Sequence, residues 1–285
     1  MFKVAQNAIL AVAITCLLVS VSCAESGFIF LASTIGPIDA GIVSVLEDAF
    51  EKESGIRVRH LGAGTGEALQ IAEKGAIDLV MVHARSLEEK FVASGFGTER
   101  IPLMYNDFVI VGPSTDPAGI YGMTSATEAL KRIAAKSAPF ITRGDKSGTH
   151  IAELELWNKA GLHPEGAWYK VFDKGNEGNA PTLKYVSQQQ AYTVIDRATY
   201  LTLKNSVQLT ILVEGDEAML NHIFLIPVSQ KKFPGVNSVD TLAFVRWLTA
   251  PAKGQKIIAD FGREKFGAPL FFPDSLEWRT NQLKK

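Results

Sequence analysis

The stretch Phe28-Ile29-Phe30-Leu31-Ala32-Ser33-Thr34 opens the part of the sequence that decides the fold. Its first five residues are apolar without alternation, which is the pattern of a strand buried on both faces of a parallel sheet. Segments with helical spacing and segments of the same strand type then alternate: helices at 38–52 and 67–74, and strands at 58–61 and 77–83. This order predicts an α/β fold with a mostly parallel sheet.

The later segments predict two lobes, each a mostly parallel sheet flanked by helices. The strand at 105–113 ends at Gly112-Pro113, which we interpret as a crossover into a second lobe, and the strand at 222–228 returns from it. We therefore predict a first lobe of residues 25–111 and 222–285, and a second lobe of residues 112–221. Within the second lobe the spacing predicts a helix at 182–194, and the Gly- and Asn-rich residues 174–181 predict a loop.

Residues 1–24 have the pattern of an export signal. Lys3 precedes an apolar run at 8–21, and Ser22-Cys23-Ala24 offers small residues for cleavage. The run is shorter than the ~20 residues that a membrane span needs. Cleavage after Ala24 would release the chain, cleavage before Cys23 would leave a cysteine for a lipid anchor, and an uncleaved anchor is the third alternative. The predicted location is periplasmic or extracellular.

Composition excludes several classes of partner and site. The 285 residues carry a formal net charge of −1, so we expect neither nucleic-acid binding nor a polybasic membrane patch. Cys16 and Cys23 are the only two cysteines, and both lie in or at the edge of the export segment, so we expect no disulfide in the mature chain. The five histidines lack metal-ligand spacing, so we expect no metal and no cofactor.

The segment Ile141-Thr142-Arg143-Gly144-Asp145-Lys146-Ser147-Gly148-Thr149-His150 predicts a strand, a glycine-containing turn and the start of a helix. Ser147 or Thr149 can cap that helix, and Arg143 brings a guanidinium to the same loop. Hydroxyls, a guanidinium and the free N–H groups of a helix N-terminus are the parts of a small oxyanion site. The alternative is an ordinary capped helix with Arg143 in a surface salt bridge.

Polar residues also follow the carboxyl ends of the first predicted strands. Ser33, Thr34, Thr65 and His83 take these positions, and ligands of parallel α/β sheets bind beyond this edge. We interpret His83 as a residue that packs the lobes together rather than as a ligand-binding residue.

Two other patterns are considered and set aside. Gly62-Ala63-Gly64-Thr65-Gly66 has Glu67 where a dinucleotide-binding loop needs its third glycine, so a tight turn beside a small ligand is preferred. Ser147 does not match the serine nucleophile elbow. A secreted hydrolase with Ser147 as nucleophile and His150 as base is an alternative function, although His150 lies three residues on, where the local helix geometry points it elsewhere than a nucleophile needs.

Several stretches together resemble one family. They are Leu31-Ala32-Ser33-Thr34, Gly64-Thr65-Gly66-Glu67-Ala68-Leu69, Met104-Tyr105-Asn106-Asp107-Phe108-Val109-Ile110-Val111-Gly112-Pro113, Arg143-Gly144-Asp145-Lys146-Ser147-Gly148-Thr149-His150 and Asp196-Arg197-Ala198-Thr199-Tyr200. They are similar to the extracytoplasmic tungstate-binding proteins of ABC transporters, which belong to the type II periplasmic-binding-protein superfamily.

This resemblance implies a two-lobe fold that holds a tetrahedral oxyanion in a cleft and delivers it to an ABC permease, without catalysis and as a monomer. The contacts that it implies are Ser33, Thr34, Thr65, Arg143, Ser147 and Thr149. The family's first loop usually carries more hydroxyls, and Ile35, Gly36 and Ala40 replace some of them. The ligand could therefore be tungstate, molybdate or another anion such as phosphate, sulfate or an organic acid, and a sensory binding module is a further alternative.

Overall fold

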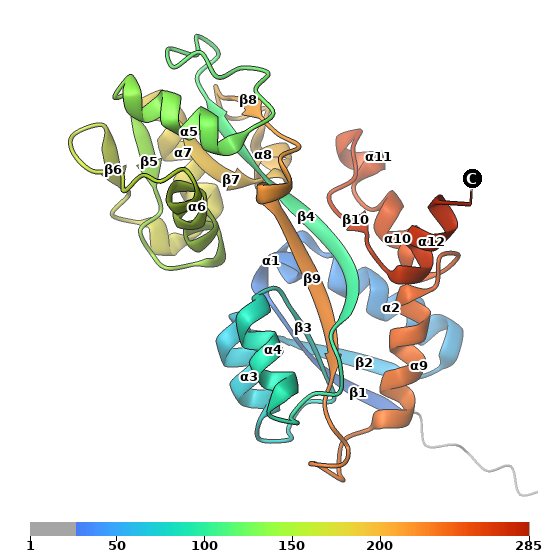
Figure 1. The fold of residues 1–285 in the computed structure, drawn as a ribbon. Coiled ribbons are helices and arrows are strands. Elements are labelled where there is room, and N and C mark those ends of the chain that lie inside the picture. Colours follow the sequence, from blue (N-terminus) through green and yellow to red (C-terminus); the bar gives the residue numbers. More distant parts are fainter. Residues whose placement is uncertain (1–26, 285) are drawn as a thin grey trace, which may run out of the picture.

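The computed structural model describes residues 27–284, and Figure 1 shows that their elements form two groups joined by two long strands. We call residues 27–100 and 228–284 the flanking group, and residues 113–219 the central group. β4 (Ile101–Gly112) leads out of the flanking group and β9 (Leu220–Pro227) leads back into it. The predicted export segment, with Cys16 and Cys23, lies outside the described residues. No helix within residues 27–284 is long and apolar enough to cross a membrane.

The flanking group is built on a mixed sheet with the strand order β10-β4-β9-β3-β1-β2. β1 (Phe28–Ser33) pairs in parallel with both β2 (Arg57–Gly62) and β3 (Leu79–Val82), as the sequence predicted. β9 is antiparallel to β3 and to β4, and β10 (Phe272–Pro273) is antiparallel to β4. The prediction of a mostly parallel sheet therefore holds only for the first three strands and is wrong for the sheet as a whole.

The path of the chain explains the antiparallel pairs. The chain leaves the flanking group along β4 and returns along β9, so two neighbouring strands must run in opposite directions. In the central group β7 (Thr193–Asp196) and β8 (Thr210–Val213) also pair antiparallel with the far half of β4. β5 (Phe140–Thr142) and β6 (Tyr169–Val171) form a parallel pair there, and isolated parallel bridges join Phe140 to Tyr192 and Met123 to Val213.

Helices cover both faces of the flanking sheet. Leu79 and Met81 of β3 pack into one hydrophobic cluster with α2 and α9, whereas Val80 and Val82 pack into another with α3 and α4. This alternation follows from the opposite directions of successive side chains in a strand. The helices of the group are α1 (Ile35–Ala40), α2 (Ile42–Ser54), α3 (Thr65–Ala72), α4 (Arg85–Ala93), α9 (Ser238–Thr249), α10 (Gly254–Asp260), α11 (Arg263–Phe266) and α12 (Leu276–Gln282).

The central group has a smaller set of helices, several of which begin at a capping side chain. Ser125 Oγ accepts the Glu128 N–H at the start of α5, and Asp196 accepts the Thr199 N–H at the start of α8. Such caps satisfy N–H groups that have no partner inside the helix. The elements are α5 (Ala126–Ala135), α6 (Gly148–Lys159), α7 (Asn179–Gln189) and α8 (Arg197–Leu203), with 3-10 turns at Gly175–Glu177 and Glu217–Met219.

Three predicted elements differ from the structure by more than a few residues at an end. The helix expected at 38–52 is divided into α1 and α2 by Gly41, whose φ of 87° a helix interior does not allow. The helix expected at 182–194 ends at Gln190 in the left-handed conformation, and β7 follows. The loop expected at 174–181 instead contains a 3-10 turn and the first turn of α7.

The hydrophobic clusters divide within the two connecting strands. Met104 and Phe108 of β4 belong to different clusters, and so do Met219, just before β9, and Ile223 within it. Between them, the Asn221 side chain donates a hydrogen bond to Asn106 Oδ1 at 2.7 Å. The two groups thus have separate apolar cores, joined by strands whose middle residues are polar.

Candidate anion-binding site

The Arg143 loop has the predicted order of elements. β5 ends at Thr142, α6 begins at Gly148, and Ser147 is the N-cap residue, whose Oγ accepts the His150 N–H at 3.4 Å. Gly144 and Lys146 both have positive φ values, 70° and 60°. A left-handed conformation is unusual for a residue with a side chain, so Lys146 marks a constrained turn.

The Arg143 guanidinium is already hydrogen-bonded to the protein. Its Nη2 donates to Asp145 Oδ2 at 2.5 Å, its Nη1 donates to Asn179 Oδ1, and Nε and Nη2 both donate to the Gly175 carbonyl, at 3.3 and 3.0 Å. The Arg143 side chain is only 10% exposed. The sequence alternative of a salt bridge is therefore partly right, although the pair lies below the surface.

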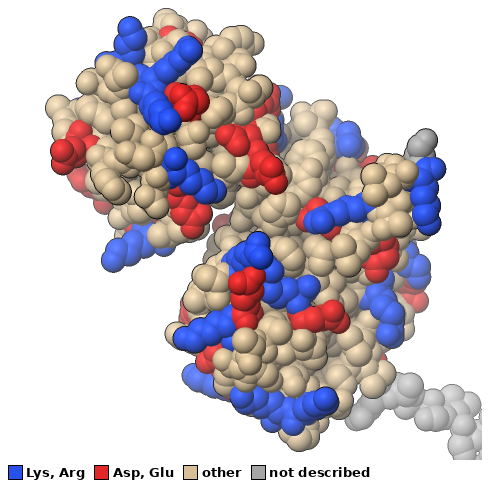
Figure 2. All heavy atoms as spheres, in the orientation of Figure 1, with Lys and Arg blue, Asp and Glu red and all other residues tan. Residues whose placement is uncertain are grey.

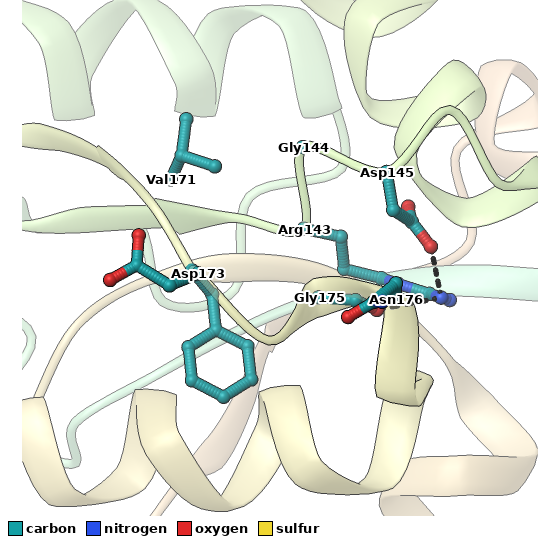
Figure 3. A pocket seen from close by; sticks show the side chains of 8 residues that line it. Arg143, Gly144, Asp145, Val171, Asp173, Gly175 and Asn176 are labelled. Atoms are coloured by element: carbon teal, nitrogen blue, oxygen red, sulfur yellow. Dashed lines mark hydrogen bonds and ion pairs between the residues drawn. The ribbon is translucent and has the colours of Figure 1, made fainter.

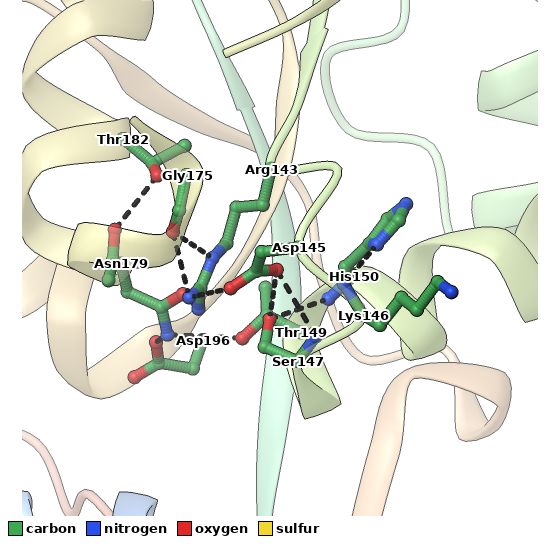
Figure 4. A network of polar contacts seen from close by, with 11 residues as sticks. Arg143, Asp145, Lys146, Ser147, Thr149, His150, Gly175, Asn179, Thr182 and Asp196 are labelled. Atoms are coloured by element: carbon green, nitrogen blue, oxygen red, sulfur yellow. Dashed lines mark hydrogen bonds and ion pairs between the residues drawn. The ribbon is translucent and has the colours of Figure 1, made fainter. Parts of the chain in front are cut away.

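Asp145 accepts hydrogen bonds from several polar groups of the loop (Figure 4). Besides Arg143, it accepts the Ser147 hydroxyl at 2.7 Å and the Ser147 N–H at 3.1 Å on Oδ1. Burial alone would raise the pKa of Asp145, but the Ser147 bonds and the Arg143 charge outweigh it and hold that pKa below its ordinary value. Asp145 is therefore an ionised carboxylate at neutral pH, and it was not among the predicted site residues.

Asn179, the first residue of α7, was also missed by the sequence analysis. Its amide nitrogen donates to Thr149 Oγ1 at 3.1 Å and to Asp196 Oδ2 at 2.6 Å, while its oxygen accepts from Arg143. Asn179 thus links two predicted site residues, Arg143 and Thr149. The sequence signal was weak, because an asparagine in a glycine-rich stretch is typical of any loop.

Close backbone packing holds the other side of Arg143. A Cβ on Gly175 would lie 1.9 Å from the Arg143 carbonyl oxygen, so only glycine fits this position. A cavity of about 340 Å³ opens beside this contact and is drawn in Figure 3. Its lining comes only from the central group: Arg143, Gly144, Asp145, Val171, Phe172, Asp173, Gly175 and Asn176.

The predicted residues of the flanking group lie at or just after the carboxyl ends of β1 and β2. Ser33 and Thr34 are both buried, and Ser33 Oγ donates to the Thr34 carbonyl at 3.2 Å. Thr34 Oγ1 is buried without any hydrogen-bond partner. Thr65 begins α3 directly after the two residues, Ala63 and Gly64, that follow β2. A buried hydroxyl without a partner is costly and rare, so Thr34 calls for an explanation.

One contact joins the two groups near these residues. His83 follows β3, and its Cε1 lies 3.3 Å from the position that a Cβ on Gly148 would occupy. Burial lowers the pKa of His83, so its ring is neutral at physiological pH. Within residues 27–284 no hydrogen bond joins Ser33, Thr34 or Thr65 to the Arg143 loop.

The contacts do not provide a catalytic serine. The Ser147 hydroxyl donates to Asp145, while His150 Nδ1 accepts the Lys146 N–H at 2.8 Å. Burial lowers the pKa of His150, but its ring is directed at the backbone rather than at Ser147 Oγ. In the part of the chain that the structure describes, no group of three or more His, Cys, Asp or Glu residues could hold a metal ion.

Comparison with known proteins gives a consistent family. Residues 23–252 match the model of the PBP superfamily domain. The chain is 41% identical over 251 residues to the tungstate-binding protein TupA of Peptoclostridium acidaminophilum, covering 87% of this chain and 86% of that protein. It is 33% identical over 242 residues to TupA of Campylobacter jejuni, covering 83% and 87% of the two chains.

Solved structures agree. The tungstate-binding protein TupA from Desulfovibrio alaskensis superimposes with a TM-score of 0.80 at 38% identity, over 87% of this chain and 99% of that one. The tungstate ABC transporter protein from Geobacter sulfurreducens gives a TM-score of 0.70 at 44% identity, over 82% and 98%. These relatives are binding proteins of transporters rather than enzymes. The chain therefore belongs to the PBP superfamily and, within it, to the family of the tungstate-binding protein TupA.

Proposed function

We propose that this protein is an extracytoplasmic solute-binding protein that captures tungstate or molybdate and delivers it to an ABC permease. Relatives that are 33–44% identical over most of the chain carry tungstate binding or tungstate transport in their names. In this proposal the protein is exported, acts as a monomer, needs no cofactor and has no catalytic role. Cleavage at Ser22-Cys23-Ala24 would decide whether it is released or anchored through Cys23.

The observation that most supports the proposed ligand site is the buried Thr34 hydroxyl without a hydrogen-bond partner. This oxygen is buried at the end of β1 and has no partner within the protein, whereas an oxyanion would accept its hydrogen bond. The other proposed contacts are the hydroxyls of Ser33, Thr65, Ser147 and Thr149, with Arg143 as the cation. Hydroxyls and N–H groups at a helix N-terminus suit an anion that stays unprotonated at neutral pH.

The proposed cleft lies between the two groups, which act as the two lobes. Figure 2 shows the surface hollowed between them. His83 of one group contacts Gly148 of the other, so the two groups approach each other at the start of α6. The division of the apolar cores supports lobe boundaries between residues 104 and 108 in β4 and between residues 219 and 223 at β9. The second is close to the predicted 221/222, whereas the first lies a few residues before the predicted 111/112. Ligand that bridges the lobes would favour a closed state, so X-ray scattering should give a smaller radius of gyration with ligand.

Isothermal titration of the mature chain with sodium tungstate, molybdate, sulfate and phosphate tests this function. We expect tungstate and molybdate to bind more tightly than sulfate and phosphate, because the relatives are named for tungstate. Ile35 and Gly36 lie in the first turn of α1, where the family loop usually carries hydroxyls. The titration therefore also determines which of tungstate and molybdate binds more tightly. Tightest binding of phosphate or sulfate would replace the proposed ligand, and no binding of any of the four anions would overturn the proposal.

A further inference from the structure

Three hydrogen-bond donors of the proposed site are directed at a single carboxylate of the protein itself. Arg143 Nη2, the Ser147 hydroxyl and the Ser147 N–H all donate to Asp145, at 2.5, 2.7 and 3.1 Å. A guanidinium, a hydroxyl and an N–H group around one anion are also what a tetrahedral oxyanion requires. In this structure a side chain of the protein takes the place that the proposed ligand needs.

The backbone holds Asp145 in this position. Gly144 and Lys146, on either side of it, both have left-handed φ values, and Lys146 carries a side chain. The Lys146 N–H is fixed by His150 Nδ1 at 2.8 Å. A turn with this strain is maintained by the groups around it, and the three bonds to Asp145 are part of that support.

The negative charges of Asp145 and of a bound oxyanion make it unfavourable for both to contact Arg143 at the same time. Arg143 and Asp145 form a pair whose side chains are 10% and 12% exposed, so their interaction is little screened by water. A dianion that reached Arg143 while Asp145 stayed in contact would meet a carboxylate a few ångströms away, and two negative charges at that distance repel each other.

We propose that Asp145 is an internal competitor of the ligand: it occupies Arg143 and Ser147 in the free protein and must be displaced when the oxyanion binds. This inference rests on the proposed function of the same site. It makes Asp145 a specificity-determining residue, because only an anion that binds these donors better than a carboxylate does can open the pair.

The first test is titration of the Asp145→Asn variant with sodium tungstate. Asparagine keeps the size of the side chain but removes its charge, so the ligand no longer competes with an anion, and we expect affinity to rise at least about fivefold. Asp173→Asn is the matched control, because exposed Asp173 lines the same cavity as Arg143 and the variant changes the net charge equally. Its affinity should stay within about twofold of the parent, since exposed charges are screened.

A second measurement uses the unaltered protein. In a crystal structure of the tungstate complex, Asp145 should have left Arg143 and Ser147, and tungstate oxygens should accept their bonds instead. An Arg143–Asp145 pair that persists with tungstate bound would overturn the inference, and so would an Asp145→Asn variant that folds but binds tungstate no more tightly than the parent. If the parent binds none of the four oxyanions, the proposed function fails and this inference fails with it, which is a distinguishable result.

Discussion

The imidazole of His83 lies against the first residue of α6: its Cε1 is 3.3 Å from the position that a Cβ on Gly148 would take. His83 follows β3 of the flanking group, and Gly148 follows the Arg143 loop of the central group. The absence of a side chain at Gly148 therefore permits the close approach of the two groups at this point beside the proposed ligand site.

Gly148→Ala should weaken ligand binding without weakening the fold. The added methyl group would lie 3.3 Å from His83 Cε1, so His83 must shift by a few tenths of an ångström, and closing the two groups further around a ligand should cost about 1 kcal/mol or more. In the free protein the contact with His83 is offset by the preference for alanine over glycine in a helix, up to about 1 kcal/mol, so thermal stability without ligand should change little. The measurements are tungstate titration and a melt without ligand.

Gly235→Ala is the control for this variant, because a Cβ there meets no atom within 4 Å and the residue has no positive φ. It should leave affinity unchanged. Equal affinities for the parent and Gly148→Ala would show that the contact of His83 with Gly148 is not part of the ligand-bound state.

Arg143→Ala should lower both affinity and stability. Loss of the proposed cation should reduce ligand affinity by at least about 2–4 kcal/mol, the scale for leaving a buried charge without its partner. Asp145 and Asn179 also lose bonds in the free protein, so the melting temperature should fall. Arg143→Lys should recover only part of the lost affinity and part of the lost stability. An ammonium group cannot reproduce the planar arrangement of bonds that the guanidinium makes to three different partners.

The double variant Arg143→Ala with Asp145→Asn separates these two roles. Removing the uncompensated carboxylate should restore part of the stability and none of the lost cationic contribution to binding. An Arg143→Ala protein that binds as tightly as the parent would place the anion elsewhere.

Glu153 predicts a pH dependence of stability. It is buried in α6, where it accepts the Trp157 indole N–H at 3.1 Å and the Tyr169 hydroxyl at 2.8 Å. Burial outweighs these bonds and raises the pKa of Glu153 from 4.5 to about 7. Between these values the folded chain keeps a proton that the unfolded chain has released, so this group should lower stability by about 3 kcal/mol as the pH rises through that window.

Urea unfolding of Glu153→Gln across pH 4.5–7 measures this contribution. Glutamine keeps an acceptor for Trp157 and Tyr169 but does not titrate, so its stability should fall less steeply with pH than that of the parent. Glu155→Gln, on an exposed position of the same helix, should follow the parent. Parallel curves for the parent and Glu153→Gln would contradict the assignment.

Thr34→Val tests the hydroxyl that has no protein partner. Valine keeps the shape, so the free protein should be as stable as the parent or slightly more stable, because an unsatisfied buried group is removed. Ligand affinity should fall by about 1.5–3 kcal/mol, the scale of a hydrogen bond to a charged group. Titration and melts of the same samples provide both quantities.

Thr241→Val is matched to this change, because Thr241 Oγ1 in α9 is also buried without a partner and belongs to none of the proposed contacts. It should resemble Thr34→Val in stability and the parent in affinity. Equal loss of affinity in both variants, or in neither, would remove Thr34 from the site.

The sequence predicted the parts of the structure that depend on short-range pattern. The apolar run at 28–32 and the Ser147 cap lie where local spacing placed them, whereas the turn expected at 62–66 is shorter, because Gly62 ends β2 and Thr65 begins α3. Strand direction was predicted less well, because the opposed directions of β4 and β9 follow from a chain reversal more than 100 residues long. The bonds of Asp145 and Asn179 were missed since they depend on the left-handed turn at Lys146 and on the approach of Gly175 to Arg143.

The position of tungsten in crystals of the mature chain tests the central claim most directly, because its anomalous scattering identifies the metal without ambiguity of element. We predict a single strong site between the two groups, with its oxygens within hydrogen-bond distance of Thr34 Oγ1 on one side and of Ser147 and Arg143 on the other. A tungsten site in the cavity that Figure 3 shows, away from Thr34, or no ordered site at saturating tungstate, would contradict the account.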